Sequence, residues 1–351
     1  DPLNPFEVLG GFGPNSELAM PGYVQPWEIN YDPNIPHGTI EEFSIMSTNL
    51  NATHSVQVYL PPSYADHPDR YYPSLYMHDG HEYVSLASAD NILDNLIETQ
   101  MISELIVVFV RPNNREEEYA DSKRDQYRLF IAEELVDYID DHYRTVQSPG
   151  ARGVAGTSFG GNISALIAYN HPDVFGKMGI HSGALWPNND EALDLWVDNP
   201  VVDVQIASVF GTLETSIYYD MTYFYDALSD KGYSIYSNFY PEGHSWGLWR
   251  ATYDEILIEL FPPGLTGLDE VSADAQTFQV FPNPVIGNQL KLNLPAGQVE
   301  TLRITNSSGQ LVATYPRPEQ QFTLPDNLAP GLYTLEAIGK DKRWTTKFII
   351  P

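Results

Sequence analysis

The sequence predicts an α/β fold, a doubly wound and mostly parallel sheet, followed by a small all-β sandwich. Two observations carry this prediction. Short apolar segments alternate with helical patterns over most of the 351 residues, whereas residues 277–351 contain only short, mostly alternating segments. Charge divides the chain at the same place: residues 1–262 hold 11 basic and 39 acidic side chains, and residues 277–351 hold 7 and 5.

Six segments of the first part have the length and composition of strands, and several lack alternation, which is typical of strands buried on both faces. They span residues 56–64, 72–80, 105–110, 151–156, 177–183 and 204–211. Helical spacing lies between them, at residues 90–100, 129–144, 161–170 and 218–232. Strands that alternate with helices predict a sheet covered by helices on both faces.

The C-terminal part contains seven short segments separated by Asn, Gly, Pro and Ser turns, which predicts an antiparallel β-sandwich. Before it, PPGLTGLDEVSADAQ has paired prolines, two glycines and no amphipathic period, as a linker would. The expected organisation is an N-terminal extension (1–36) packed on an α/β domain (37–262), a linker (263–276) and a β-sandwich domain (277–351).

Composition excludes several classes of protein. The net charge of -29 argues against nucleic acid, anionic lipid and highly anionic substrates as partners. The absence of cysteine excludes disulfides, thiolate metal sites and cysteine nucleophiles. The longest apolar run, Leu105 to Val110, is far shorter than the roughly 20 residues that span a bilayer, so no membrane insertion is expected. A chain that starts at Asp1 with no leader is what a processed, exported protein shows.

The segment GVAGTSFGG (153–161) places Ser158 between Gly156 and Gly160, behind a buried strand and ahead of a helix. Glycines at these two positions let strand and helix approach closely around a strained turn that exposes the serine hydroxyl. The sequence therefore predicts a nucleophile, with a plain tight turn as the alternative. A serine nucleophile needs a base and the base an orienting acid, in the chain order Ser, acid, His.

Three histidines follow Ser158. His171 lies at a helix end, as a capping or surface residue would, and His181 lies inside an apolar strand, which indicates a core or pocket-lining role. His244 lies in the loop YPEGHSWGLWR, from which an imidazole can reach over the sheet, so we predict that it is the base.

Glu214 is the predicted acid. It ends the strand-like VQIASVFGTLE, at the carboxyl edge where ligand sites of open α/β sheets lie. Asp220 and Asp226 compete for this role, but both fall in a helical pattern that indicates a solvated helix face.

Two backbone N–H groups are expected to bind the oxyanion of an acyl-transfer intermediate. One is that of Phe159, and the other is that of Gly80 or His81 in YMHDGHEYV. An acidic turn with no catalytic role is the alternative for this second loop. The two histidines of HDGH need no zinc in this interpretation, and no calcium-loop spacing occurs, so neither a metal nor a cofactor is expected.

Aromatic side chains are abundant near the predicted site. Loop residues Trp186 and Trp246 are the preferred substrate contacts, because the run from Tyr218 to Tyr225 has the spacing of a helix packed in a core. Arg115, just after the strand LIVVFV, is a third candidate for substrate binding, with an ion pair to Glu117 or Glu118 as its alternative.

Several of these segments occur in a known order. "VYLPPSY", "YPSLYMHDG", "RPNNREEEY", "EELVDYIDDHYRT", "GVAGTSFGG", "HSGALW" and "EGHSWGLWR" resemble esterases related to enterochelin esterase, feruloyl esterases and acetylxylan esterases, over residues 37–261. The resemblance implies an α/β-hydrolase fold and ester hydrolysis through an acyl-enzyme. It carries the nucleophile onto Ser158, the base onto His244 and, on the loosest match, the acid onto Glu214.

The tail has its own resemblance. "FPNPV", "ITNSSGQLV", "LAPGLYTLEA" and "TTKFIIP" resemble the C-terminal sorting domain of type IX secretion in Bacteroidota. The resemblance implies export through the periplasm to the medium or the cell surface, with the secretion machinery as partner. An accessory carbohydrate-binding sandwich is the alternative.

The combined prediction is a secreted serine carboxylesterase that acts on acyl or feruloyl esters of polysaccharides. A siderophore esterase is an enzymatic alternative, although the acidic first domain would repel an anionic siderophore. A peptidase of the prolyl oligopeptidase type would share the fold and the triad. The propeller domain of such peptidases is missing from this sequence, which argues against this alternative. A noncatalytic surface binding protein with a hydrolase fold is the remaining alternative.

Overall fold

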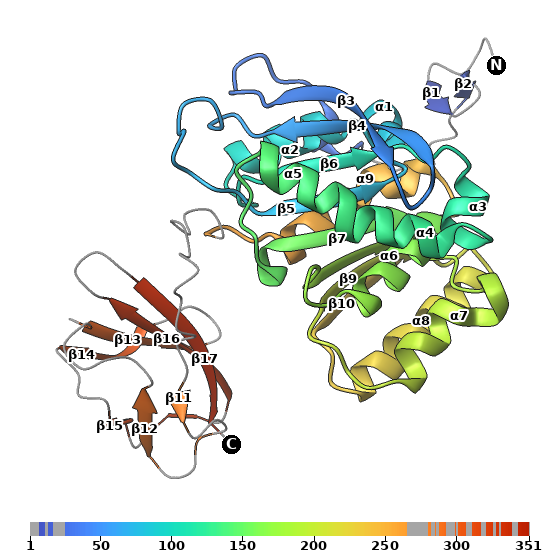
Figure 1. The fold of residues 1–351 in the computed structure, drawn as a ribbon. Helices are drawn as coiled ribbons and strands as arrows, with labels where there is room; N and C mark the ends of the chain where they lie inside the picture. The colour runs from blue at the N-terminus through green and yellow to red at the C-terminus, as the bar shows by residue number, and fades with distance from the viewer. Residues whose placement is uncertain are drawn as a thin grey trace. The chain divides into compact units, whose positions relative to one another are not determined.

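The computed structural model describes residues 25–264, two short N-terminal strands, and the strands with neighbouring positions of the C-terminal part (Figure 1). The chain forms two compact units, Asp1–Glu270 and Val271–Pro351. Their boundary lies inside the segment 263–276 that the sequence predicts as a linker. The two N-terminal strands, β1 (Glu7–Gly10) and β2 (Gly13–Ser16), form an antiparallel pair.

An eight-stranded sheet in the order β10-β9-β8-β7-β5-β6-β4-β3 organises the first unit. Strands β5 to β10 are parallel, and β4 and β3 add an antiparallel edge. The strands are β3 (Thr39–Ser47), β4 (Ala52–Leu60), β5 (Ser74–His78), β6 (Ile106–Val110), β7 (Arg152–Thr157), β8 (Lys177–His181), β9 (Gln205–Gly211) and β10 (Ile235–Tyr240). Because six strands are parallel, the loops that leave their carboxyl ends share one edge of the sheet.

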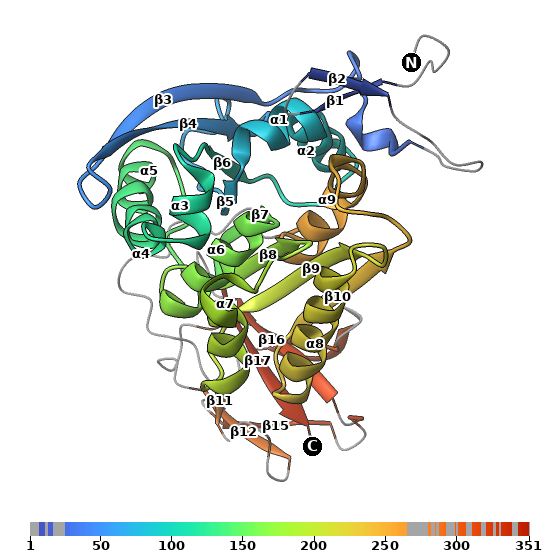
Figure 2. The ribbon, with the colours of Figure 1, turned by 90° about the vertical axis from the view of Figure 1, so that its right-hand side faces the viewer.

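Helices cover both faces of this sheet (Figure 2). One apolar cluster joins it to α5, α6, α7 and α8, and a second joins it to α1, α2 and α9. The α-helices are α1 (Gly80–Ala87), α2 (Ala89–Glu98), α3 (Arg115–Ala120), α4 (Arg124–Leu129), α5 (Val136–His142), α6 (Phe159–Asn170), α7 (Pro187–Asp198), α8 (Ser216–Asp230) and α9 (Trp246–Leu260). Short 3-10 turns lie at Trp27–Ile29 and Pro149–Ala151, and a π-helical turn, Phe130–Leu135, joins α4 to α5.

The predicted doubly wound α/β sheet is confirmed, and each of the six predicted strands corresponds to one of β4 to β9. The sequence did not predict β3, because this edge strand is exposed along most of its length and so lacks an apolar signal. The helical pattern at 129–144 is correct in position, but it belongs to a longer stretch that begins at Arg124 and contains the π-helical turn.

The described part of the predicted N-terminal extension packs on α2. The side-chain amide of Asn95 donates to the carbonyl groups of Glu28 (2.7 Å) and Asn30 (2.9 Å), and that of Asn91 donates to the carbonyl of Ile29 (2.9 Å). Residues 1–24, apart from β1 and β2, lie outside the described residues.

The described residues of the second unit are all-β, as the sequence predicts. It contains two antiparallel sheets, in the orders β11-β12-β15 and β14-β13-β16-β17. Their apolar side chains form one core that includes Leu290, Leu302, Leu335 and Phe348. The strands are β11 (Val280–Phe281), β12 (Gln289–Leu292), β13 (Thr301–Asn306), β14 (Leu311–Pro316), β15 (Gln321–Thr323), β16 (Gly331–Ile338) and β17 (Arg343–Ile350).

Candidate active site

The residues predicted to form a site follow the carboxyl ends of parallel strands. Each lies in the loop or first helical turn after one of the strands β5 to β10, so the sheet brings them to one edge although up to 164 positions separate them in the chain. In strand order from β5 to β10, these residues are Gly80 and His81, Arg115, Ser158, Trp186, Glu214 and His244.

Ser158 occupies a strained turn between β7 and α6, with φ 57° and ψ -118°. Its N–H donates to the carbonyl of His181 (2.9 Å), and its own carbonyl accepts from the N–H of Ala184 (3.1 Å), so β8 and the loop after it hold the turn in place. The flanking glycines are sterically required. A Cβ at Gly156 would lie 2.6 Å from the carbonyl carbon of Gly160. The turn therefore has the geometry expected of a nucleophile elbow.

Glu214 and His244 form a hydrogen-bonded pair. Nδ1 of His244 lies 2.8 Å from Oε1 of Glu214, and the other carboxylate oxygen accepts the N–H of Gly211 at 2.7 Å. The side chain of Glu214 is fully buried, whereas that of His244 is 37% exposed. A carboxylate accepts hydrogen bonds, so Nδ1 carries the proton of this contact. In the neutral imidazole the lone pair then lies on Nε2, which is the form a general base needs.

Backbone hydrogen bonds fix the loop that carries Glu214 to the loop that carries His244. The N–H of Thr212 donates to the carbonyl of Tyr240 (2.7 Å), and the N–H of Leu213 donates to the carbonyl of Glu242 (3.0 Å). These bonds extend the pairing of β9 and β10 beyond the strand ends. Glu214 and His244 thus come together because their strands are neighbours, although the residues are 30 positions apart.

Trp249 connects His244 to the end of β8, whose backbone holds the Ser158 turn. Its ring lies edge-to-face with the imidazole of His244, 4.8 Å between centroids, and its Nε1 donates to the hydroxyl of Ser182 at 2.9 Å. Ser182 directly follows His181, whose carbonyl holds the N–H of Ser158. Among the described residues no hydrogen bond joins Ser158 directly to His244, so the structure links them through Trp249 and the end of β8.

The predicted oxyanion donors lie at two helix starts. Phe159 opens α6 and Gly80 opens α1, and the first N–H groups of a helix have no partner within it. Gly80 is packed against β6, because a Cβ there would lie 2.4 Å from Cα of Phe109. The preceding Asp79 is left-handed, with φ 55°, which turns the chain from β5 into the helix. Both helix starts therefore offer unpaired donors at the same sheet edge.

Arg115 does not pair with either of the carboxylates considered from the sequence. Its Nε and Nη2 each lie 2.7 Å from a carboxylate oxygen of Asp79, and Nη2 also donates to the carbonyl of Thr157 at 3.0 Å. Glu117 pairs with Lys123 instead, and Glu118 with His54. The ion-pair alternative was right about the chemistry and wrong about the partner, because the true partner is 36 residues away in sequence.

Trp186 and Trp246 differ in exposure. Trp186 is 42% exposed and lies edge-to-face with the ring of Phe159, 6.1 Å between centroids. Trp246 is half-buried and packs against Tyr83 and Trp249. The loop of Trp186 continues into three left-handed residues, Asn188 to Asp190, so the chain is strained beside the exposed ring.

Two other histidines have structural roles. His181 is buried, its Nδ1 lies 2.7 Å from the hydroxyl of Tyr83, and burial lowers its pKa to about 4. His171 is the C-cap residue of α6, and its Nε2 lies 2.6 Å from Nη1 of Arg128. Asp220 and Asp226 lie on α8, within the helix that their spacing predicts.

The sequence missed three residues of this edge: Asp79, Ser182 and Trp249. The position of Asp79 in the sequence is informative, because it lies between a buried strand and a glycine. An aspartate tolerates the left-handed conformation that such a turn from a strand into a helix needs. Ser182 and Trp249 left none, because their bond joins positions 67 residues apart.

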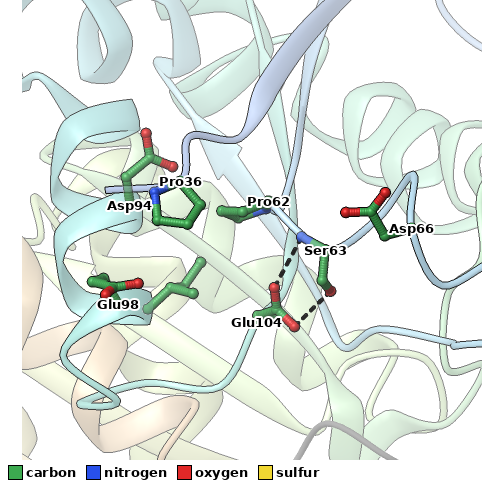
Figure 3. Close-up of a pocket in the computed structure, with 8 residues that line it drawn as sticks. Pro36, Pro62, Ser63, Asp66, Asp94, Glu98 and Glu104 are labelled. Atoms are coloured by element: carbon green, nitrogen blue, oxygen red, sulfur yellow. Dashed lines mark hydrogen bonds between the residues drawn. The ribbon is translucent and has the colours of Figure 1, made fainter. Parts of the chain in front are cut away.

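A cavity of about 250 Å³ lies at the opposite edge of the sheet, near the start of β6 (Figure 3). Two of its four carboxylates, those of Asp94 and Glu104, are already engaged. Glu104 accepts the N–H and hydroxyl of Ser63, and Asp94 accepts the N–H of Gly38 and the hydroxyl of Tyr59. Over the described residues, no group of three His, Cys, Asp or Glu side chains is arranged to hold a metal ion. We assign no role to this cavity.

Comparison with known proteins assigns two segments of the chain to known families. Residues 47–260 match the family described as "Putative esterase", and residues 279–351 match the "Secretion system C-terminal sorting domain". The chain belongs to this esterase family and is a carboxylic ester hydrolase, which opposes the alternative of a noncatalytic binding protein. The sorting domain is that of type IX secretion and indicates export to the medium or the cell surface. In the described part of the chain, no helix has the length and apolar character needed to cross a membrane.

Individual relatives agree with this assignment. The chain is 30% identical over 189 residues to the uncharacterized protein YjcH of Bacillus subtilis, covering 52% of this chain and 76% of that protein. It is 27% identical over 167 residues to an endo-1,4-beta-xylanase/feruloyl esterase of Xylanibacter ruminicola, covering 44% of this chain and 23% of that protein.

Solved structures show the same fold. The enterobactin esterase FES of Shigella flexneri, determined in the presence of enterobactin, superposes with a TM-score of 0.64 at 25% identity, over 74% of this chain and 68% of that one. A ferulic acid esterase of Anaeromyces mucronatus superposes with a TM-score of 0.56 at 16% identity, over 66% and 94%.

Proposed function

We propose that this esterase is a serine carboxylesterase in which Ser158, His244 and Glu214 form the catalytic triad. The observation that carries the proposal is the hydrogen-bonded pair of buried Glu214 and exposed His244, at the same sheet edge as the strained Ser158 turn. A nucleophile, a base and an orienting acid on three loops of one sheet edge are what acyl transfer requires.

In the proposed mechanism, Ser158 Oγ attacks the ester carbonyl while Nε2 of His244 takes the hydroxyl proton. The N–H groups of Phe159 and of Gly80 or His81 bind the negative charge on the tetrahedral intermediate. His244 then gives the proton to the leaving alcohol, and an acyl-enzyme forms. Water repeats the sequence and releases the acid. Glu214 holds Nδ1–H throughout and stabilises the imidazolium as it forms.

The proposed substrates are acyl or feruloyl esters linked to a polysaccharide. Export to the cell exterior and the relative that combines xylanase and feruloyl esterase both support a plant-glycan substrate. The exposed ring of Trp186 lies beside Phe159, which directly follows the proposed nucleophile. Such rings stack on sugars and on phenolic acyl groups. Trp246, which is half-buried, is the second proposed substrate contact.

A siderophore trilactone is the second candidate substrate. The similarity to the enterobactin esterase of Shigella flexneri favours it. Charge opposes it, because residues 1–262 carry 39 acidic and 11 basic side chains, which would repel an anionic ferric siderophore.

One panel of esters tests both the mechanism and the substrate class. Acetyl, feruloyl, glucuronoyl and siderophore esters are assayed with wild-type protein and with Ser158→Ala. We expect Ser158→Ala to lose activity by about 10⁴-fold or more on every ester that the wild type hydrolyses. His171→Gln, a histidine outside the predicted triad, serves as the matched control and should keep its activity. Comparable rates for wild type and Ser158→Ala would refute the nucleophile.

A further inference from the structure

Arg115 joins the two backbone segments that carry the proposed oxyanion donors. Its guanidinium donates hydrogen bonds to both carboxylate oxygens of Asp79, which directly precedes Gly80. It also donates to the carbonyl of Thr157, two residues before Phe159. A guanidinium fork that meets both oxygens of a carboxylate fixes orientation as well as distance. One side chain therefore spans the start of α1 and the start of α6.

Asp79 is buried at the point where these two helices meet. Its side chain is 5% exposed, and its Oδ2 would lie 3.0 Å from a Cβ placed on Gly160, so the carboxylate packs against the first turn of α6. Its N–H donates to the hydroxyl of Tyr119 at 3.1 Å. Without Arg115, this carboxylate would be a buried charge that has lost its cationic partner, and the two helix starts would lose their cross-link.

The helix that Arg115 opens, α3, is itself fixed to α6. The side-chain amide of Asn162 donates to the carbonyl of Tyr119 (2.9 Å), which ties α3 to α6. The guanidinium lies over the rings of Tyr119 and Phe159, 5.6 Å from each centroid. Arg115 therefore contacts the side chain of Phe159, whose N–H is a proposed oxyanion donor.

The hydrogen-bond capacity of Arg115 is mostly used within the protein. Arg115 has five N–H donors. The N–H on Nε and the two on Nη2 have protein acceptors, which leaves the two N–H groups on Nη1 as the remaining donors. A side chain engaged in this way has little left with which to hold a substrate. The same contacts hold two loops at a fixed separation.

We infer that Arg115 and Asp79 are positioning residues, which hold the N–H of Phe159 and the N–H of Gly80 or His81 at the separation that an oxyanion requires. This inference rests on the proposed serine mechanism. The pair acts through the backbone of its neighbours and need not touch the substrate. Because the oxyanion exists only in the transition state, loss of the pair should lower kcat and leave KM nearly unchanged.

The test compares Arg115→Gln, Asp79→Asn and the double variant on p-nitrophenyl acetate. We expect each single variant to lose about 10- to 100-fold in kcat, as a donor displaced by roughly 1 Å would, with KM changed less than about twofold. Affinity for a trifluoromethyl ketone, which forms a tetrahedral adduct with the serine, should fall by the same factor as kcat/KM. Arg111→Gln, an exposed arginine four residues earlier, is the matched control and should behave as wild type.

The double variant tests whether the two residues act as one unit. It should lose no more activity than the worse single variant, and additive losses would overturn the inference. A raised KM at unchanged kcat would show that Arg115 binds substrate, and an unchanged kcat would also overturn the positioning role. If Arg115→Gln fails to fold, Arg115→Lys keeps the charge without the fork and should still show the loss in kcat.

Ser158→Ala, assayed alongside, separates this inference from the proposed function. Activity that persists in Ser158→Ala refutes the triad itself. An inactive Ser158→Ala together with a fully active Arg115→Gln refutes only the positioning role.

Discussion

The loops around Ser158 are crowded and cross-linked, whereas the loops around His244 are open to solvent. On the nucleophile side, a Cβ added at Gly80 or Gly156 would meet backbone atoms within 2.6 Å. On the acid–base side, a Cβ at Gly243 would meet nothing within 4 Å, and the His244 side chain is 37% exposed. The carboxylate of Glu214 is buried there, and Gly211 at the base of this side is enclosed as well, because a Cβ there would lie 2.2 Å from the carbonyl oxygen of Glu242.

This contrast follows from what each side has to do in the proposed mechanism. Oxyanion donors stabilise a transition state only if they are already in position, so packing that fixes them is useful. The base must instead exchange protons with the leaving alcohol and with water, which requires an accessible nitrogen. Rigidity and access are thus divided between two groups of loops on one sheet edge.

The largest expected effect comes from breaking the hydrogen bond between Glu214 and His244 on the acid–base side. Glu214→Gln keeps the size of the side chain but removes the carboxylate that fixes the Nδ1–H form of His244, so kcat should fall about 10³- to 10⁴-fold. Steady-state hydrolysis of p-nitrophenyl acetate measures this loss. Glu242→Gln, on the adjacent exposed loop, should keep wild-type activity. A Glu214→Gln enzyme with more than about a tenth of wild-type kcat would remove Glu214 from the triad.

A matched pair of glycine substitutions sharpens the comparison through stability. Gly156→Ala forces a methyl group to within 2.6 Å of the Gly160 carbonyl carbon, and we expect it to reduce the free energy of unfolding by about 2–3 kcal/mol. Gly243→Ala has open space and should change it by less than about 0.5 kcal/mol. Urea unfolding of the two variants measures both values. Equal effects would mean that the two sides are equally tolerant.

The smallest expected effect is a loss of folding stability at low pH. Burial lowers the pKa of His181, behind the nucleophile, to about 4, below the usual 6.5 of the unfolded chain. The unfolded state therefore binds this proton first, and the stability that a neutral His181 contributes is complete above pH 6.5 and is lost as the pH falls towards 4.

Urea unfolding at several pH values between 7 and 4 tests this dependence. His181→Gln should show a shallower loss of stability over that range than the wild type, while His171→Gln should follow the wild type more closely. Identical slopes for wild type and His181→Gln would contradict the assignment of a neutral, buried His181.

The sequence was sufficient wherever a feature has a local pattern. Buried strands carry continuous apolar runs, and the glycines around Ser158 mark a strained turn at fixed spacing, so the parallel sheet and the nucleophile candidate could both be predicted. The pairing of Glu214 with His244 was also accessible, because each follows a strand and parallel strands deliver their loops to one edge.

Contacts between distant loops could not be predicted in this way. Arg115 has three glutamates directly after it in sequence, yet its partner is Asp79, because the fold of α3 against α6 turns the guanidinium towards the end of β5. The bond from Trp249 to Ser182 likewise depends on how α9 packs against β8. No periodicity or spacing within one segment encodes either contact.

The exposure of His244 has a consequence for how this enzyme is assayed. In the proposed mechanism, a base that is open to water remains hydrated until a substrate covers it. A bulky native ester would dry the imidazole on binding and strengthen its hydrogen bonds, whereas a small chromogenic acetate would leave it wet. Rates measured on small esters should therefore understate the rate on the natural substrate.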